Sequence, residues 1–167
     1  MATTNLRGNP VKTSGPLPRI GVKAKDFLLT GNDMHDKTLA DFKGKKILLN
    51  IFPSVDTPVC AMSVRKFNAE AASVKNAVIL CVSRDLPFAL SRFCGAEGIK
   101  NVITLSELRN RDFGSNYGLE MVSGPMAGML ARAVVIIDAA GKVAYRELVD
   151  DITHEPNYAV ALKELKK

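Results

Sequence analysis

Three short runs of apolar residues stand out along the chain, each bounded by polar or turn-forming residues. They cover residues 47–52, 77–82 and 133–138. Continuous apolar runs of this length are typical of strands buried on both faces of a sheet. After the third run, the turn signal Ala139-Ala140-Gly141 leads into residues 142–149, which are predicted to form an antiparallel strand. The pattern therefore predicts a central sheet built from these segments.

The segments between these runs carry the periodicity of helices. The first predicted helix begins near Cys60 and presents one face of apolar or small residues, at Val64, Phe67, Ala71 and Val74. The second begins at Pro87, and its predicted apolar face consists of Leu86, Leu90, Phe93 and Cys94. The third begins near Pro156 and carries Tyr158, Leu162 and Leu165. Apolar strands with helical crossovers predict an α/β fold of three layers.

The N-terminal part of the chain has a different character. Residues 1–18 are polar and rich in Gly and Pro, and they are interpreted as an extended segment of a single domain that spans residues 1–167. Phe27-Leu28-Leu29 before Gly31-Asn32-Asp33 predicts a β-hairpin within residues 26–36. Residues 1–18 do not resemble a secretory signal, and no run approaches the ~20 apolar residues of a membrane span. We therefore expect a cytoplasmic protein without membrane association.

Charge and composition give no sign of a nucleic-acid partner. The 23 Lys and Arg against 17 Asp and Glu give a net charge of +6, but the basic residues are scattered along the chain. Aromatic residues are only 6 % of the chain and are not interleaved with the short basic clusters. A stacking surface for single-stranded nucleic acid is therefore not expected.

Cysteine and histidine usage excludes two further classes. Three cysteines without a CxxC spacing predict neither a disulfide-stapled secreted domain nor a zinc ribbon. The two histidines, His35 and His154, do not lie at metal-ligand spacing from a cysteine. We therefore do not expect a structural metal site.

The most informative position is Cys60, at the start of the first predicted helix. Thr57 fits the N-cap and Pro58 the first helical position, which places Cys60 in the first turn. Unpaired N–H groups and the helix dipole favour an anion there. A free thiol is only about 3 % thiolate at pH 7, and predominant ionisation needs roughly 3.4 kcal/mol. A helix terminus supplies about 0.3–1 kcal/mol. Further donors are therefore required.

Three kinds of donor are candidates for the Cys60 sulfur: the Thr57 hydroxyl, backbone N–H groups and a cationic side chain. Arg65 is the nearest arginine in the predicted helix, but it points away from the Cys60 side. An arginine from elsewhere in the chain has to approach through the fold. The alternative interpretation is that Cys60 is simply a small core residue at the end of an apolar stripe.

The spacing Pro53-x-x-x-Thr57-x-x-Cys60 resembles the peroxiredoxin signature, and Thr57-Pro58-Val59-Cys60 is similar to its bacterial thiol peroxidase branch. The resemblance runs from about Arg19 to the C-terminus and includes residues 21–27 and 128–134. It implies a thioredoxin-like three-layer sandwich with an added N-terminal β-hairpin. It also implies a homodimer that reduces hydrogen peroxide and alkyl hydroperoxides without a cofactor, with thioredoxin as the reductant.

The same resemblance implies roles for individual residues. Cys60 would be the peroxidatic cysteine, Thr57 and Arg132 its activating partners, and Pro53 a shield for the pocket. Arg132 precedes an apolar run, so it enters at the edge of the sheet, where its five donors suit a thiolate and a peroxide oxygen. On residue type alone, an ordinary surface position is the favoured interpretation of Arg132.

The resemblance implies that Cys94 is the resolving cysteine, which forms an intramolecular disulfide with Cys60. Gly95 and Gly98 support this role because each glycine weakens a helix by ~1 kcal/mol, and a disulfide requires the two Cα atoms within ~7 Å. A buried core cysteine is the alternative interpretation. Cys81 lies inside an apolar run and is interpreted as packing. The Met-rich segment 121–130 suits a pocket wall, a dimer interface or core.

Two other functions remain to be distinguished. A cysteine hydrolase would need His35 or His154 as a general base beside Cys60, together with an oxyanion hole. A non-catalytic thioredoxin-like binding or chaperone module would need none of these residues for chemistry. One assay separates the three functions. A peroxidase consumes hydroperoxide when a dithiol is supplied, a hydrolase releases acyl products, and a binding module does neither.

Overall fold

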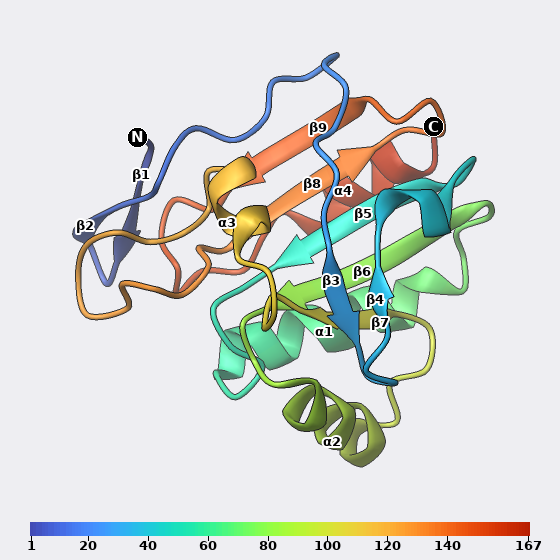
Figure 1. Cartoon of the computed structure of the whole chain (residues 1–167), viewed down its shortest axis with the longest axis horizontal. Coiled ribbons are helices and arrows are strands. Elements are labelled where there is room, and N and C mark those ends of the chain that lie inside the picture. Colours follow the sequence, from blue (N-terminus) through green and yellow to red (C-terminus); the bar gives the residue numbers. More distant parts are fainter.

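The three apolar runs form the centre of a seven-stranded mixed sheet in the computed structural model, which describes residues 1–167 (Figure 1). The strand order is β4-β3-β7-β6-β5-β8-β9. The runs correspond to β5 (Lys46–Ile51), β6 (Ala77–Ser83) and β8 (Ala133–Ile137). β5 pairs parallel with β6 and antiparallel with β8. β9 (Val143–Leu148) pairs antiparallel with β8, as the sequence predicted.

Three short strands complete the other edge of the sheet. β7 (Ile103–Ser106) pairs parallel with β6 and antiparallel with β3 (Leu29–Gly31). β4 (Asp36–Lys37) pairs antiparallel with β3, which confirms a hairpin close to the predicted position. The sequence pattern did not predict β7. Its four residues alternate between apolar and polar types, so they do not form a distinct apolar run.

Alternate residues of the central strands pack against two different apolar layers. Ile47, Leu49 and Ile51 of β5 face the larger cluster, whereas Leu48 faces the smaller one together with Cys60. This alternation is the pleat of a strand that is covered on both faces. The three-layer arrangement predicted from the sequence is therefore present.

Helices occupy both faces of the sheet. α1 (Pro58–Ala71), α2 (Pro87–Glu97) and α4 (Tyr158–Leu165) contribute to the layer that contains Cys60. The other face is covered by the 3-10 helix η1 (Leu39–Phe42), the short α3 (Asp112–Asn116) and loop segments.

Two details of the predicted helical faces are wrong. Val74 lies beyond the end of α1, and Leu86 is the N-cap of α2 with 52 % of its surface exposed.

The N-terminal segment is not merely extended. β1 (Thr3–Leu6) and β2 (Asn9–Lys12) form a separate antiparallel hairpin, which confirms the added hairpin and corrects the interpretation of residues 1–18. Its turn, Arg7-Gly8, has two positive φ angles, 50° and 79°, a geometry that matches the twist of a two-residue hairpin. The sequence pattern hid it because only Thr4 and Val11 of the two strands are buried.

The hairpin is attached to the loop after β9. The Thr4 hydroxyl donates to the Val149 carbonyl at 2.7 Å. The Asp151 carboxylate accepts hydrogen bonds from the backbone N–H groups of Arg7 and Gly8, at 3.2 and 2.8 Å. A hydrogen bond from the Thr153 hydroxyl, together with these backbone bonds, holds the pKa of Asp151 well below its usual range. The turn of the hairpin is thus fixed beside residues 149–153.

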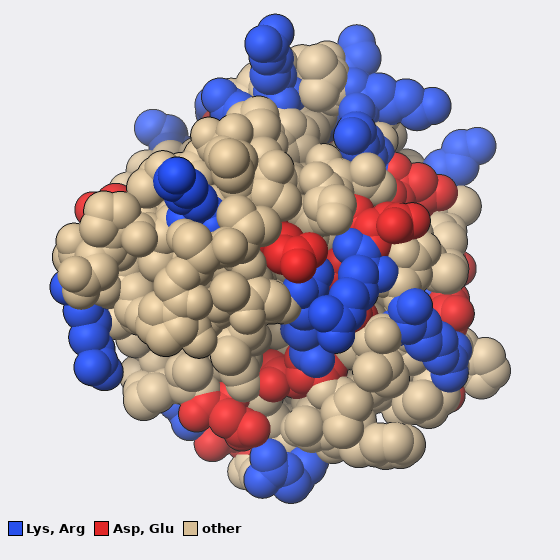
Figure 2. Space-filling model, turned by 60° about the vertical axis from the view of Figure 1, so that its left-hand side comes forward, with Lys and Arg blue, Asp and Glu red and all other residues tan.

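The outer surface is unevenly charged. Figure 2 shows Lys and Arg side chains along the upper edge and over the right-hand part of the visible face, with Asp and Glu side chains between several of them, and a broad area at left centre with few charged side chains. The charged part is typical of a solvated surface. No helix in the structure has both the length and the apolar character needed to span a membrane.

Candidate active site

Cys60 lies in the first turn of α1, as its sequence context predicted. β5 ends at Ile51, a short loop follows, and α1 begins at Pro58 with Thr57 as the N-cap residue. The Thr57 backbone is extended, with φ −94° and ψ 144°, as expected for this position. Cys60 is fully buried, so its sulfur lies beneath the helix terminus rather than on the surface.

The Thr57 hydroxyl has a different partner from the one expected. It donates to the Ser54 carbonyl at 3.0 Å and makes no hydrogen bond to the Cys60 sulfur. The Thr57 backbone N–H donates to the same carbonyl, at 3.1 Å. The side chain therefore stabilises the tight turn before α1, which places its oxygen on the wall of the pocket described below.

Arg132 is the residue that reaches the Cys60 sulfur. Its Nη2 donates to Cys60 Sγ at 3.1 Å, and its Nε donates to the Ile152 carbonyl at 2.8 Å. The side chain is only 2 % exposed, and its third donor nitrogen, Nη1, has no hydrogen-bond partner. A buried guanidinium without full pairing is energetically costly. Such an arrangement therefore suggests that a further group occupies the site during function.

Sheet pairing explains how Arg132 and Cys60 meet across 72 positions of sequence. In the antiparallel register of β5 and β8, Ile51 pairs with Ala133. Arg132, immediately before Ala133, therefore enters at the same edge where β5 leads into the α1 loop. Arg65 is not involved, because its guanidinium pairs with Glu97 on α2.

A pocket of about 230 Å³ opens above these groups. It brings together Pro53, Thr57 and Arg132, three of the residues that the sequence resemblance singled out. The remaining walls come from four other parts of the chain: Leu6 and Arg7 of the hairpin, Pro58 and Val59 of α1, Met126, and Ile152 and Thr153. The sequence carries no local signal for the hairpin and the 152–153 loop as pocket walls, because their approach depends on the Asp151 contacts.

Asp85 stabilises the loop that carries Pro53. Its carboxylate accepts hydrogen bonds from the Ser54 hydroxyl at 2.7 Å and from the Val55 backbone N–H at 2.8 Å. Asp85 follows β6, the parallel neighbour of β5, so the two loops meet at the same edge of the sheet. The sequence analysis did not single out Asp85, since a carboxylate in a loop has no distinguishing pattern.

Cys94 lies on α2, away from Cys60. Its sulfur is 3.7 Å from the Thr104 hydroxyl of β7, and partial burial raises the pKa of its thiol. The Cys60 sulfur instead accepts a hydrogen bond from Arg132, the residue that precedes β8. β7 and β8 are three strand spacings apart, roughly 14 Å. A bond between the two thiols would therefore require movement of α2, of the first turn of α1, or of both.

Cys81 has the environment of a packing residue. It is fully buried in β6, where burial raises the pKa of its thiol to about 12. Its nearest polar group is the Asn50 side-chain amide, whose nitrogen lies 3.7 Å from the sulfur. A thiol with this pKa is almost entirely protonated at neutral pH and is a poor nucleophile.

Neither histidine is near Cys60. His35 pairs with Asp33 and His154 with Asp150, and both histidines are solvent-exposed. The structure contains no group of three or more His, Cys, Asp or Glu side chains arranged to hold a metal ion. The pocket lined by Pro53, Thr57 and Arg132 therefore contains no histidine to act as the general base of a cysteine hydrolase.

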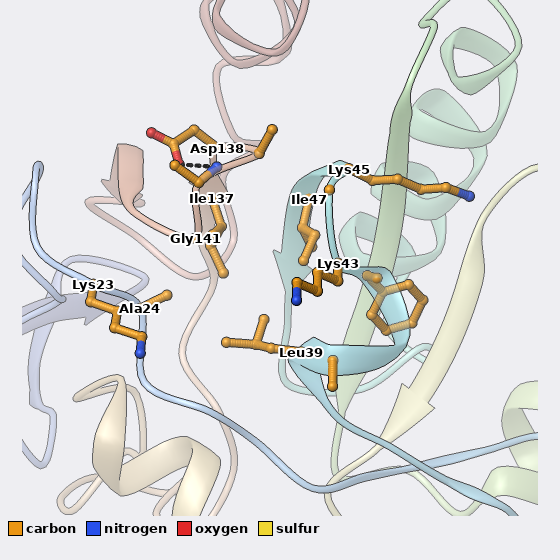
Figure 3. Close-up of a pocket in the computed structure, with 14 residues that line it drawn as sticks. Lys23, Ala24, Leu39, Lys43, Lys45, Ile47, Ile137, Asp138 and Gly141 are labelled. Carbon is orange, nitrogen blue, oxygen red and sulfur yellow. Dashed lines mark hydrogen bonds between the residues drawn. The ribbon is translucent and has the colours of Figure 1, made fainter.

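A larger cavity of about 350 Å³ lies at the opposite end of β5 and β8 (Figure 3). Its walls include Leu39, Ile47 and Ile137, with Lys43 projecting towards its interior, and Lys45 points away. It contains no cysteine or histidine, and Asp138 is engaged by backbone N–H groups of its own turn. The cavity is therefore separate from the pocket that Arg132 and Thr57 line.

Comparison with known proteins gives a consistent result. The Redoxin family model matches residues 19–162. The chain is 56 % identical over 165 residues to thiol peroxidases of Mycobacterium tuberculosis and Mycobacterium bovis, and 99 % of each chain is covered. A peroxiredoxin-like protein from Aquifex aeolicus has a similar structure, with a TM-score of 0.94 and 41 % identity over 99 % of this chain and 96 % of that one. The thiol peroxidase from Chromobacterium violaceum has a TM-score of 0.89 and 25 % identity, with 98 % of this chain and 94 % of that chain covered.

The fold and the thiol site together define a redox protein of the peroxiredoxin type. The chain belongs to the redoxin family, and its full-length similarity places it among the thiol peroxidases. It is thus a thiol-dependent peroxidase.

Proposed function

We propose that this protein reduces hydrogen peroxide and alkyl hydroperoxides with the Cys60 sulfur as the attacking atom, through an intramolecular Cys60–Cys94 disulfide that thioredoxin reduces. The observation that carries the proposal is the pairing of the Cys60 sulfur with Arg132 at 3.1 Å, while Arg132 Nη1 stays unpartnered. One donor stabilises the thiolate, and the other is free to bind an oxygen of the hydroperoxide.

In the first step, the Cys60 thiolate attacks the terminal oxygen of the hydroperoxide. An S–O bond forms as the O–O bond breaks, the terminal oxygen keeps its proton, and the leaving alkoxide or hydroxide takes up a proton from solvent and departs as an alcohol or water. The sulfur keeps the terminal oxygen as a sulfenic acid. Arg132 acts by stabilising the negative charge that develops on the leaving oxygen, in a site where the guanidinium is already buried and positioned.

Thr57 and Pro53 orient and shield the substrate. The Thr57 hydroxyl donates its only proton to the Ser54 carbonyl, so its oxygen is left to accept a hydrogen bond from the hydroperoxide O–H. Pro53 lines the same pocket and has no N–H group of its own. Leu6, Met126 and Ile152 supply apolar walls that suit an alkyl group.

In the second step, Cys94 attacks the sulfenic acid sulfur. A disulfide forms and water leaves, after which two thiol–disulfide exchanges with thioredoxin restore both thiols. In the closed structure, burial raises the pKa of the Cys94 thiol and so disfavours its reactive thiolate. Movement of α2 therefore has two effects: it brings the sulfurs together and exposes Cys94 to solvent.

The test is a coupled assay with hydrogen peroxide or an alkyl hydroperoxide, thioredoxin, thioredoxin reductase and NADPH. We expect NADPH oxidation that depends on this protein and on thioredoxin. A cysteine hydrolase would release acyl products from thioesters instead. A binding or chaperone module would do neither, and absence of peroxide consumption with any dithiol would refute the proposal.

We expect Arg132→Lys to lower the rate of the Cys60–peroxide reaction at least about tenfold, equivalent to ~1.4 kcal/mol of barrier. Lysine keeps the charge but cannot bond the Ile152 carbonyl, the sulfur and the peroxide at once, because it lacks the planar fork of donors. The measurement is the second-order rate of peroxide-dependent thiol oxidation. Arg109→Lys is the matched control, since Arg109 pairs with Asp36 on the surface. Equal rates for Arg132→Lys and wild type would mean that Arg132 has no catalytic role.

We further propose a homodimer of single-domain subunits that acts in the cytoplasm. A reducing compartment suits recycling by thioredoxin.

The residues of segment 121–130 have different environments. Met121 and Leu130 lie in the core, Met126 lines the pocket beside Arg132, and Val122 and Met129 are exposed and available for an interface. Exposed Phe88 and a broad area of Figure 2 with few charged side chains support an interface. Light scattering of the reduced protein tests this, and a mass near 18.1 kDa would contradict it.

A further inference from the structure

The C-terminal half of α2 is tied to α1 by a bidentate ion pair. Arg65 on α1 donates from Nε and Nη2 to the two carboxylate oxygens of Glu97 on α2, at 2.8 and 2.9 Å. Glu97 lies three residues after Cys94, one helical turn away. The Arg65 guanidinium also lies 6.0 Å from the ring centre of Phe93, the residue before Cys94. A single side chain of α1 thus contacts α2 on both sides of Cys94.

A second tie lies one turn further along α1. The Asn68 side-chain oxygen accepts hydrogen bonds from the backbone N–H groups of Lys100 and Asn101, at 3.1 and 2.8 Å. Arg65 and Asn68 are three positions apart, so they share one face of the helix. Both bonds end on the segment that leads out of α2.

Few side chains of this segment are buried. Of residues 95–100, only Ile99 is buried. Gly98 ends α2 in the left-handed region, with φ 65°, and its backbone N–H donates to the Cys94 carbonyl. Gly95, inside the last turn, adds further backbone freedom. The side chains of α1 therefore contribute a large share of the attachment at this end of α2.

We propose that Arg65 and Glu97 are positioning residues that hold the Cys94 turn closed and set the rate at which Cys94 reaches the oxidised Cys60. The proposal rests on the proposed function, because it concerns the second step of that reaction. In the closed state the Cys60 sulfenic acid persists, and it can react with a second hydroperoxide to give a sulfinic acid and an alcohol or water. Opening of α2 competes with this reaction.

The expected size of the effect follows from exposure. The Arg65 and Glu97 side chains are 42 % and 34 % exposed, and such ion pairs contribute modestly even with bidentate geometry. We expect loss of the pair to speed disulfide formation about threefold. Because the two charges are accessible to salt, added salt should also speed this step in wild type, and less so in a variant without the pair.

The test compares wild type with Glu97→Gln, Arg65→Glu and the charge-swapped Arg65→Glu/Glu97→Arg. After mixing with hydrogen peroxide, quenched samples are alkylated and analysed by mass spectrometry for thiol, sulfenic acid, disulfide and sulfinic acid. Sulfenic acid formation should keep its wild-type rate in all variants. Disulfide formation should be about threefold faster in both single variants, with less sulfinic acid at high peroxide, and should return towards the wild-type rate in the swapped pair.

Glu164→Gln is the matched control, because Glu164 of α4 pairs with Lys167 in a surface ion pair remote from α2, and its loss should leave both steps unchanged. Equal disulfide rates in wild type and Glu97→Gln, or a swapped pair as fast as the single variants, would overturn the positioning role. If no Cys60–Cys94 disulfide forms in wild type, the proposed function itself fails. The two failures are therefore distinguishable.

Discussion

Replacing Cys60 by serine is expected to lower peroxide consumption at least about a thousandfold, equivalent to ~4 kcal/mol of barrier. Serine keeps the size of the side chain, so the Arg132 donor retains a partner and the pocket keeps its shape. The serine hydroxyl stays protonated at neutral pH, and no histidine lies beside it as a general base. The loss would therefore be chemical rather than structural.

Cys81→Ser is the matched control for this experiment. The same substitution is made at a fully buried cysteine of the same apolar layer, with the Asn50 amide available as a hydrogen-bond donor. The thioredoxin-coupled assay should give near wild-type activity for Cys81→Ser and only background for Cys60→Ser. Substantial activity in Cys60→Ser, or comparable losses in both variants, would disprove the assignment of Cys60 as the attacking residue.

Oxidation by peroxide is expected to produce an intramolecular Cys60–Cys94 disulfide, with Cys81 left as a free thiol and with little net gain in stability. A crosslink that closes about 35 residues is worth roughly 4 kcal/mol of unfolded-state entropy. Against this gain, α2 has to leave its closed position. The movement loses the packing of Leu90, which is fully buried, and of Phe93. It also breaks the Arg65–Glu97 pair.

Two measurements check this prediction. Peptide mapping of the oxidised protein under non-reducing conditions identifies the linked cysteines, and denaturant melts of both redox forms give the difference in unfolding free energy. A Cys60–Cys81 link, or dimers joined through Cys60 as the main product, would exclude Cys94 as the resolving cysteine. An oxidised form more stable by the full ~4 kcal/mol would show instead that α2 does not have to unwind.

Near-cancellation of these terms has a functional consequence. A disulfide that strongly stabilised the fold would resist reduction, because its reduction potential would be low. A disulfide that costs packing is readily reduced by a dithiol protein. The loose end of α2 at Gly95 and Gly98 would therefore serve both disulfide formation and recycling.

Features that depend on local pattern could be predicted from the sequence. The central strands β5, β6 and β8 appear as apolar runs, because a strand covered on both faces needs apolar residues at consecutive positions. The start of α1 was also predictable, since the N-cap preference of Thr57 and the fixed φ of Pro58 act over a few residues. These two signals together placed Cys60 at a helix terminus after a buried strand.

Features that depend on pairing between distant segments required the tertiary structure. Arg132 reaches the Cys60 sulfur only because β8 pairs antiparallel with β5, so that Ala133 lies opposite Ile51. Resemblance suggested this partner, but no local pattern distinguishes Arg132 from a surface arginine. The N-terminal hairpin likewise becomes a wall of the pocket through its bonds to Asp151.

The sequence by itself determined which residues carry reactive chemistry, because the type of a residue and its immediate neighbours specify a thiol at a helix start. Only the tertiary structure decided which groups surround that thiol. Cys94 illustrates the difference: its glycine neighbours predicted a weak helix end, whereas its contact with Thr104 and the Arg65–Glu97 tie show what holds that end closed. Local propensity acts within one or two helical turns, but contacts between α1, α2 and β7 are set by the order of strands in the sheet.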